Sequence, residues 1–206
     1  MTDFIPAINH LGRTDRFLRR LIQKIGPCAL KIRNHRSPFR ALAQSITYQQ
    51  LNATAAASIF GRFKALYPSR RFPTPEELLA TSDKRLRSAG FSRAKVAALK
   101  DLAAQTISGV VPSSRVIRAL SDAEIVERIT VVRGIGPWTV EMLLIFALGR
   151  PDVWPVTDYG VRKGFARLYG LKELPTPKEL LAHGEKWRPH RSVAAWYLWR
   201  AAELPE

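Results

Sequence analysis

The residue types best suited to chemistry lie in one segment, RITVVRGIGPWTVEMLLIFALGRPDVWPVTD, which spans residues 128–158. It holds two glycines two positions apart, Gly134 and Gly136, and it ends on a carboxylate, Asp158. Glycines at this spacing permit a tight turn with positive φ and leave backbone N–H groups uncovered. Before a helix N-terminus, such groups form an anion site that the helix dipole supports. The segment therefore combines a candidate phosphate-binding hairpin with a candidate catalytic carboxylate.

Each of these features also has a simpler explanation. Gly-Ile-Gly alone describes a turn between two core helices in most proteins, and an aspartate before a helix is commonly its N-cap. The context favours the hairpin, because the apolar positions Ile125, Ile129 and Val132 precede it, and Pro-Trp-Thr with an apolar run follows it. Contacts of this kind would hold a phosphate without reading bases.

Helix-start signals recur along the chain and must position these residues. Three capping boxes are expected, from the pairs Thr74 with Glu77, Ser121 with Glu124, and Thr176 with Glu179. The segment Glu76–Ala89 is predicted to be one helix that ends at Gly90, and Ser92 is predicted to cap the next helix. The best strand candidate, Ile107–Val111, is short and is followed by proline. We therefore predict an all-α protein of roughly eight to ten helices.

We expect these helices to form one domain over residues 1–206, with two lobes. The middle lobe would span about residues 36–148, and residues 1–35 with 149–206 would form the other lobe. The boundary is weakly marked, because the composition does not shift along the chain.

Composition narrows the function classes. Apolar residues make up 46% of the 206 residues, which is enough for a folded interior. The longest apolar run, Met142–Leu148, is too short to span a membrane, and the N-terminus lacks the order of a secretory signal. Cys28 is the only cysteine, which excludes a disulfide framework within the chain and suits the cytoplasm. The net charge of +16 favours a polyanionic partner such as nucleic acid.

The sequences VRGIGPWTVEMLLIFALGR and WPVTDYGVRKG, with AQSITYQQL at 43–51 and WRPHRSVAAWYLWR at 187–200, resemble the helix-hairpin-helix (HhH-GPD) superfamily of DNA glycosylases. The most similar branch is that of 3-methyladenine DNA glycosylase II, which acts on alkylated bases, and this chain looks like a compact form. The resemblance covers about residues 36–201. It implies a two-lobed helical fold with the helix-hairpin-helix motif at about residues 122–148.

The resemblance also implies an activity, the hydrolysis of the N-glycosidic bond of an N-alkylated purine that has been rotated out of the duplex. The default substrates are 3-methyladenine and 7-methylguanine in base-excision repair. Asp158 falls at the position of the family's essential aspartate. An alkylated base already carries positive charge and leaves easily, so one carboxylate that stabilises the oxocarbenium-like sugar suffices. Asp158 can fill this role and cap the following helix at the same time.

Trp138 distinguishes between branches of the superfamily. Relatives that also cleave the strand carry a lysine at this position, two residues after the second hairpin glycine, and tryptophan cannot serve as an amine nucleophile. We therefore expect a monofunctional glycosylase without lyase activity. Trp138 offers a π face to an electron-poor purine, although simple core packing is an equal alternative.

The resemblance assigns further residues to the base pocket and to the DNA contacts. The expected pocket residues are Trp138, Trp199, Met142, Tyr48 and Trp196. Gln50, with Leu51 beside it, is expected to fill the gap left by the everted nucleotide. The expected phosphate-binding residues are Arg133, Gly134, Gly136, Thr139, Ser92, Arg93, Lys95 and Lys163. Each of these charges could equally be a solvated surface residue, and Trp196 or Trp199 could simply belong to the core.

No cofactor is expected to be required, and no side chains show metal-ligand spacing. In relatives a monovalent cation such as Na⁺ or K⁺ can bridge hairpin carbonyls and phosphate, here those of residues 132–136. The expected partner is double-stranded DNA carrying alkylated bases, with no membrane, bound by a monomer in the cytoplasm and associated with the nucleoid in a bacterium. The alternatives are a non-catalytic DNA-binding module, a glycosylase–lyase, and a glycosylase with another base preference.

Overall fold

The computed structural model describes residues 3–32, 37–68 and 72–205. Within these ranges it contains thirteen α-helices, a π-helical segment and a short 3-10 helix, and no strand. The α-helices are α1 (Ile5–Thr14), α2 (Arg16–Ile25), α3 (Pro38–Tyr48), α4 (Ala53–Ala65), α5 (Pro75–Ala80), α6 (Asp83–Ser88), α7 (Arg93–Ile107), α8 (Ser114–Ala119), α9 (Asp122–Ile129), α10 (Pro137–Leu143), α11 (Tyr159–Tyr169), α12 (Pro177–Gly184) and α13 (Arg191–Glu203). The π-helical segment is Leu144–Leu148, and the 3-10 helix is Glu185–Trp187.

The all-α prediction is confirmed, and the helix count was too low. The segment 76–89 is not one helix: α5 ends at Ala80, and Ser82 caps α6 through the amide of Arg85. The suggested strand 107–111 is also wrong, because α7 extends to Ile107 and Gly109 then turns the chain at φ +82°. A helix of six residues is too short to show a hydrophobic period. The sequence pattern therefore predicted one helix where two short helices form, and it did not reveal others.

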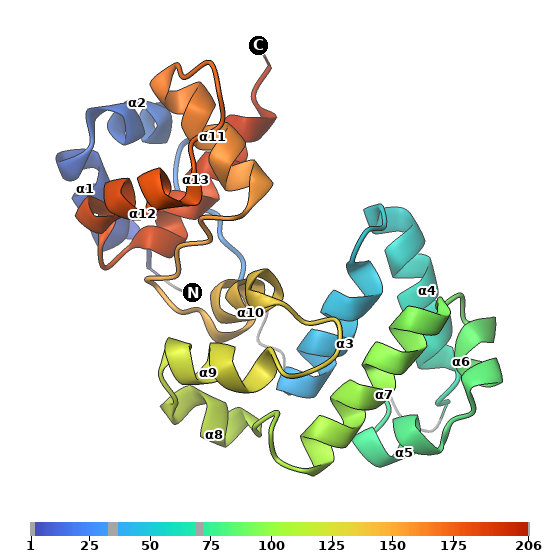
Figure 1. Cartoon of the computed structure of the whole chain (residues 1–206). Helices are drawn as coiled ribbons and strands as arrows, with labels where there is room; N and C mark the ends of the chain where they lie inside the picture. The colour runs from blue at the N-terminus through green and yellow to red at the C-terminus, as the bar shows by residue number, and fades with distance from the viewer. Residues whose placement is uncertain (1–2, 33–36, 69–71, 206) are drawn as a thin grey trace. The chain divides into compact units, whose positions relative to one another are not determined.

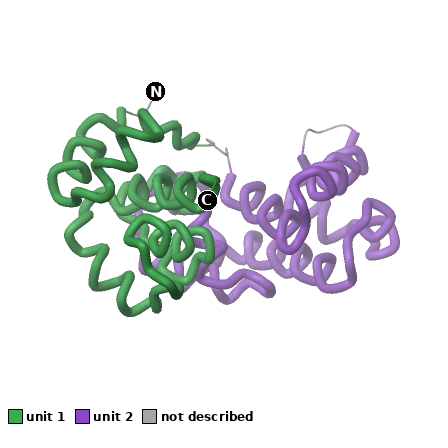
Figure 2. Tube along the Cα trace, turned by 90° about the horizontal axis from the view of Figure 1, so that it is seen from above, with its two compact units in different colours: residues 1–33, 144–206 green, residues 34–143 purple. Residues whose placement is uncertain are grey.

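Two compact units make up the chain, coloured separately in Figure 2. Unit 1 comprises residues 1–33 and 144–206, and unit 2 comprises residues 34–143. The division after Leu143 therefore falls inside the helical run that follows the glycine hairpin.

Unit 1 is built on the packing of α11 against α13, with α2 beside both (Figure 1). Trp187, Tyr197, Leu11 and Leu18 are fully buried in its core. Asp15 ties α1 and α2 to this core, because it caps α2 and also accepts from the Tyr169 hydroxyl and from Trp187 Nε1.

Unit 2 is arranged around α7, which packs against α3, α5 and α6, while α10 packs against α3 and α9. Its core includes an aromatic cluster of Phe60, Phe63, Phe72 and Phe91, whose rings lie in edge or tilted contact. All three expected capping boxes are present. Over the described ranges, no helix has the length and apolar character to cross a bilayer.

Candidate functional site

The glycine hairpin joins α9 to α10 in unit 2. Val132 and Ile135 are buried, and their amides donate to the carbonyls of Ile129 and Val132 at 3.1 and 3.0 Å. Gly134 adopts φ +76°, a conformation that favours glycine. Apolar anchors on the inner side thus hold a turn whose glycines face outward, since Gly134 and Gly136 are both exposed.

The hairpin amides differ in their partners. The amide of Arg133 donates to Oδ2 of Asp101 at 2.7 Å, which fixes the first residue of the turn to α7. Among the described residues, no acceptor faces the amides of Gly134 and Gly136. Backbone amides without an internal acceptor must be satisfied by solvent or by a ligand. The arrangement is therefore suited to an anion.

A pocket of about 550 Å³ lies beside the hairpin within unit 2, a size typical of small-ligand sites. It brings together six of the residues expected from the sequence: Tyr48, Gln50, Gly134, Trp138, Thr139 and Met142. Ser45 and Gln49 complete its lining. Trp138 is 44% exposed, so much of its ring is not used in core packing.

The turn after α3 carries the two residues expected to enter DNA. Gln50 and Leu51 are both exposed. Gln50 adopts φ +56° and is the only non-glycine residue with positive φ in the described part of the chain. Such a conformation persists where surrounding contacts impose it.

The expected phosphate contacts are in different situations. The side chains of Arg133 and Arg93 are exposed, and Lys163 is half-buried in α11 of unit 1. Ser92 Oγ accepts from the amide of Lys95 and so caps α7. Lys95 Nζ donates to the carbonyls of Thr47 and Gln49 at 2.7 and 2.9 Å, and burial lowers the pKa of this ammonium. The hydroxyl group of Thr139 is 3.4 Å from Gln49 Nε2, and Thr139 is buried.

Asp158 lies in unit 1, at the start of α11, and is only 8% exposed. Its Oδ1 accepts from the amide of Val161 at 2.8 Å, so the residue is the N-cap of α11. The same oxygen accepts from Trp199 Nε1 at 2.8 Å. The capping role is therefore present, and Oδ1 of the carboxylate is held by donors from two helices.

Two glycines of α11 allow α13 to approach this carboxylate. A Cβ on Gly160 would lie 2.8 Å from Trp199 Cδ1 and 3.2 Å from Asp158 Oδ1. A Cβ on Gly164 would lie 1.9 Å from the carbonyl oxygen of Leu198. These glycines, one helical turn apart, share one face of α11. They let the α13 backbone pass close enough for the indole to reach Asp158.

The two C-terminal tryptophans expected in the pocket have different neighbours. Trp199 stacks on Phe146, with ring centroids 5.5 Å apart and an interplanar angle of 26°. Trp196 makes an edge contact with Tyr197, and Arg200 lies over its ring. Both tryptophans are half-buried against the core of unit 1.

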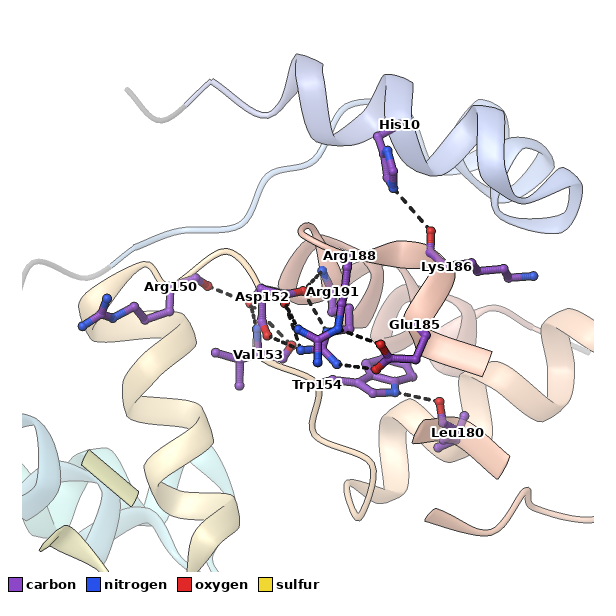
Figure 3. A network of polar contacts seen from close by, with 11 residues as sticks. His10, Arg150, Asp152, Val153, Trp154, Leu180, Glu185, Lys186, Arg188 and Arg191 are labelled. Carbon is purple, nitrogen blue, oxygen red and sulfur yellow. Dashed lines mark hydrogen bonds and ion pairs between the residues drawn. The ribbon is translucent and has the colours of Figure 1, made fainter. Parts of the chain in front are cut away.

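The loop before Asp158 is clamped to the start of α13 (Figure 3). Buried Arg191 donates from Nε and Nη2 to the two carboxylate oxygens of Asp152, at 2.8 and 2.9 Å. Ser192 Oγ donates to the carbonyl of Arg150 at 2.7 Å and accepts from the amide of Val153 at 3.0 Å. Paired, charge-assisted contacts of this kind fix geometry well. They hold the segment that leads into Asp158.

Sequence reasoning missed four residues that shape these sites: Gln49, Phe146, Gly160 and Arg191. The glycine spacing in YGVRKG could have signalled a close helix crossing, since the two glycines are four residues apart. The other three are defined by partners distant in sequence, and no local pattern marks them.

Comparison with known proteins places these features in a family. Residues 43–190 match the family described as HhH-GPD superfamily base excision DNA repair protein. The chain is 40% identical to DNA-3-methyladenine glycosylase 1 of Schizosaccharomyces pombe, over all of this chain and 91% of that protein.

Two solved structures have the same fold. A 3-methyladenine DNA glycosylase of S. pombe in complex with abasic DNA has a TM-score of 0.86 and 40% identity, covering 97% of each chain. A DNA-3-methyladenine glycosidase of Bacillus halodurans has a TM-score of 0.85 and 35% identity, covering 96% of this chain and 89% of that one. The chain therefore belongs to the HhH-GPD superfamily of base excision DNA repair proteins.

Proposed function

We propose that this protein is a monofunctional DNA glycosylase that everts and hydrolytically excises N-alkylated purines. Its substrates would be of the 3-methyladenine and 7-methylguanine type, in double-stranded DNA. The observation that carries the proposal is the buried Asp158, held by Val161 and Trp199, in a chain 40% identical to a 3-methyladenine glycosylase. The whole chain, residues 1–206, would act as one glycosylase domain.

The chemistry requires one carboxylate. The C1′–N bond breaks, and its electron pair leaves with the base and neutralises the base's positive charge. Positive charge develops on the sugar, and a negative Asp158 stabilises it. The oxygen of water then bonds to C1′ and loses a proton, a step that an oriented carboxylate can assist. Trp199 would keep Asp158 in its orientation throughout.

The pocket beside the hairpin supports a role in base recognition. Tyr48, Trp138 and Met142 line it, and the exposed face of Trp138 suits stacking with an electron-poor purine. From the family we also propose that Trp199 and Trp196, which belong to unit 1, contact the everted base. Gln50, with Leu51, would fill the space that the everted nucleotide leaves, and the exposed turn with positive φ at Gln50 supports this role.

The hairpin would hold a DNA phosphate through Gly134 and Gly136, with Arg133 and Arg93 adding charge. Thr139, Ser92 and Lys163 would complete the set of phosphate contacts. The carbonyl oxygens of the hairpin would also suit a monovalent cation such as Na⁺ or K⁺. The carbonyls of Val132 and Gly134 each accept one internal hydrogen bond, which leaves each oxygen a second lone pair, whereas the Gly136 carbonyl accepts from the amides of both Thr139 and Val140. A cation there would draw the phosphate to the turn, and no cofactor would take part in the reaction.

The partner would be duplex DNA with alkylated bases, which matches the charge of +16. We place the protein, as a monomer, in the cytoplasm, where it would associate with the nucleoid if the source is bacterial.

Release of free base from a methylated duplex tests the proposal. Wild-type protein should release 3-methyladenine or 7-methylguanine, and Asp158→Asn should lower the single-turnover rate by about 10³-fold. Asparagine is the chosen replacement because it removes the negative charge and keeps a side-chain oxygen that can cap α11. Release that survives in Asp158→Asn would remove the mechanism. No release from any of a panel of lesions, with DNA binding intact, would favour a non-catalytic DNA-binding module.

A further inference from the structure

The turn from Gln49 to Asn52, which joins α3 to α4, is held from two sides in unit 2. Gln50 in this turn has φ +56°, a backbone conformation that residues other than glycine rarely adopt unless neighbouring contacts impose it. The contacts of Gln49, the residue immediately before it, are therefore informative.

The first contact comes from α7. Lys95 Nζ donates to the carbonyls of Thr47 and Gln49, at 2.7 and 2.9 Å. These carbonyls lie at the C-terminal end of α3, where the last carbonyls of a helix lack intrahelical partners and the dipole favours a cation. The ammonium of Lys95 is thus used to fix the backbone on which Gln50 is carried.

The second contact comes from the hairpin. Gln49 Nε2 donates to the carbonyl of Gly134 at 3.0 Å and lies 3.4 Å from Thr139 Oγ1. Its backbone is therefore held by Lys95, while its side chain is bonded to the residue at the centre of the glycine turn. One residue links the two places that the proposed function assigns to phosphate binding and to DNA insertion.

We propose that Gln49 and Lys95 are positioning residues that couple the glycine hairpin to the insertion of Gln50 into DNA. This inference rests on the proposed function of the hairpin and of Gln50. It also replaces the expected role of Lys95, because an ammonium bonded to two carbonyls positions the turn instead of contacting phosphate.

Insertion can be measured without catalysis. The probe is a duplex with a tetrahydrofuran abasic analogue beside 2-aminopurine, whose fluorescence reports unstacking next to the gap. Gln49→Glu keeps the size of the side chain but places a carboxylate against the carbonyl of Gly134. Lys95→Met keeps the stem and removes the three donors. Each should weaken the insertion equilibrium about tenfold, from the net worth of the lost hydrogen bonds. Gln50→Ala should abolish the signal and serves as the reference.

Salt dependence separates positioning from phosphate contact. Lys95→Met should leave the slope of log affinity against log salt unchanged while the insertion signal falls. The comparison is Arg93→Met in the first turn of α7, where the side chain is exposed; loss of this proposed phosphate contact should lower the slope by about one. A lower slope with a full signal in Lys95→Met would overturn the proposal. Lys95→Arg should restore part of the signal.

Failure of the coupling can be distinguished from failure of the proposed glycosylase function. A wild-type protein that gives the insertion signal but releases no base would contradict the glycosylase assignment and leave the coupling standing. Base release by the wild type, with an unchanged insertion signal in both Gln49→Glu and Lys95→Met, would remove the coupling alone. Gln49→Glu is expected to fold like the wild type, because it changes a half-buried side chain at a turn and no core residue.

Discussion

Trp199 Nε1 donates a hydrogen bond to Oδ1 of Asp158 over 2.8 Å. The same oxygen accepts from the amide of Val161, so a single atom of the carboxylate joins α13 to the first turn of α11. Asp158 is buried, and a buried carboxylate requires such donors. The indole therefore orients the proposed catalytic group, beyond the role in the base pocket that the family suggests.

Replacement of the donor tests this relationship. Trp199→Phe keeps an aromatic ring to stack on Phe146 but cannot bond Asp158. Hydrogen bonds to charged groups contribute about 1.5–3 kcal/mol, so the single-turnover rate of base release should fall roughly 10- to 100-fold. Affinity for abasic DNA serves as the control and should change little. A variant with an unchanged rate and weakened binding would assign Trp199 to substrate contact alone.

The glycines of α11 provide a matched pair of variants. Gly160→Ala would place a methyl group 2.8 Å from Trp199 Cδ1, and the indole must move away from Asp158. Neither glycine has positive φ, so alanine suits the helix at both positions. We expect Gly160→Ala to lower the rate of base release about tenfold, as loss of the indole donor would, with little change in the free energy of unfolding.

Gly164→Ala, unlike Gly160→Ala, should strongly lower the free energy of unfolding. Its methyl group would lie 1.9 Å from a backbone oxygen of Leu198, which a rotamer change cannot relieve. Overpacking of this kind should destabilise unit 1 by about 3 kcal/mol or more. Urea unfolding followed by tryptophan fluorescence measures the difference between the two variants. Equal stability of both would show that α13 shifts easily.

The sequence predicted much of the local structure because capping chemistry is local. Thr74, Ser121 and Thr176 each start a helix as expected, and each box needs only the residue three positions later. The failures lie where six-residue helices follow one another. Nothing within the segment 76–89 is a strong helix breaker, yet the chain ends one helix at Ala80 and caps the next at Ser82.

The sequence could predict those parts of the candidate site that lie within short motifs. Gly134, Trp138 and Met142 follow from the hairpin sequence and meet in one pocket with Tyr48. The contacts that orient the site depend on long-range packing instead. Lys95 illustrates this difference: a lysine in the first turn of a helix suggests a phosphate contact, but its partners lie 46 and 48 residues earlier in the chain.

A Schiff base should not form on abasic DNA. The family resemblance aligns Trp138 with the reactive lysine expected in strand-cleaving members, and its indole has no amine to attack C1′. Borohydride treatment of the protein with abasic duplex should therefore leave no covalent adduct, and the strand should remain intact. A glycosylase–lyase run in parallel serves as the positive control. A trapped adduct with this protein would reveal another lysine as nucleophile and contradict monofunctional action.

Acid should weaken unit 1 through Asp15. Burial alone would raise its pKa, but hydrogen bonds from His183, Lys186 and Tyr169 hold the pKa of this carboxyl well below its usual range. The folded state then binds the proton less tightly than the unfolded state. The stability that results is present above about pH 5 and is lost as the pH falls through about 4 toward the lowered folded-state pKa.

Asp15→Asn isolates this contribution, because asparagine can still cap α2. We expect the variant to be about 2 kcal/mol less stable near neutral pH, from the loss of hydrogen bonds to a charged group. Its difference from wild type should shrink as the pH falls from about 5 to 2 in urea unfolding. A constant difference across that range would show that the charge of Asp15 is not responsible.

Salt should control DNA affinity through the exposed arginines and the hairpin. If six or more phosphates are held, the affinity should fall by roughly 10³-fold between about 50 and 200 mM salt. Arg133 is the sharpest probe, because its amide is fixed to Asp101 at 2.7 Å while its side chain is exposed. Arg133→Ala should weaken binding equally for unrelated duplex sequences and lower the salt slope by about one. Fluorescence anisotropy with several duplexes measures both effects. Since a phosphate contact carries no base information, a loss confined to some sequences would show instead that Arg133 reads base edges.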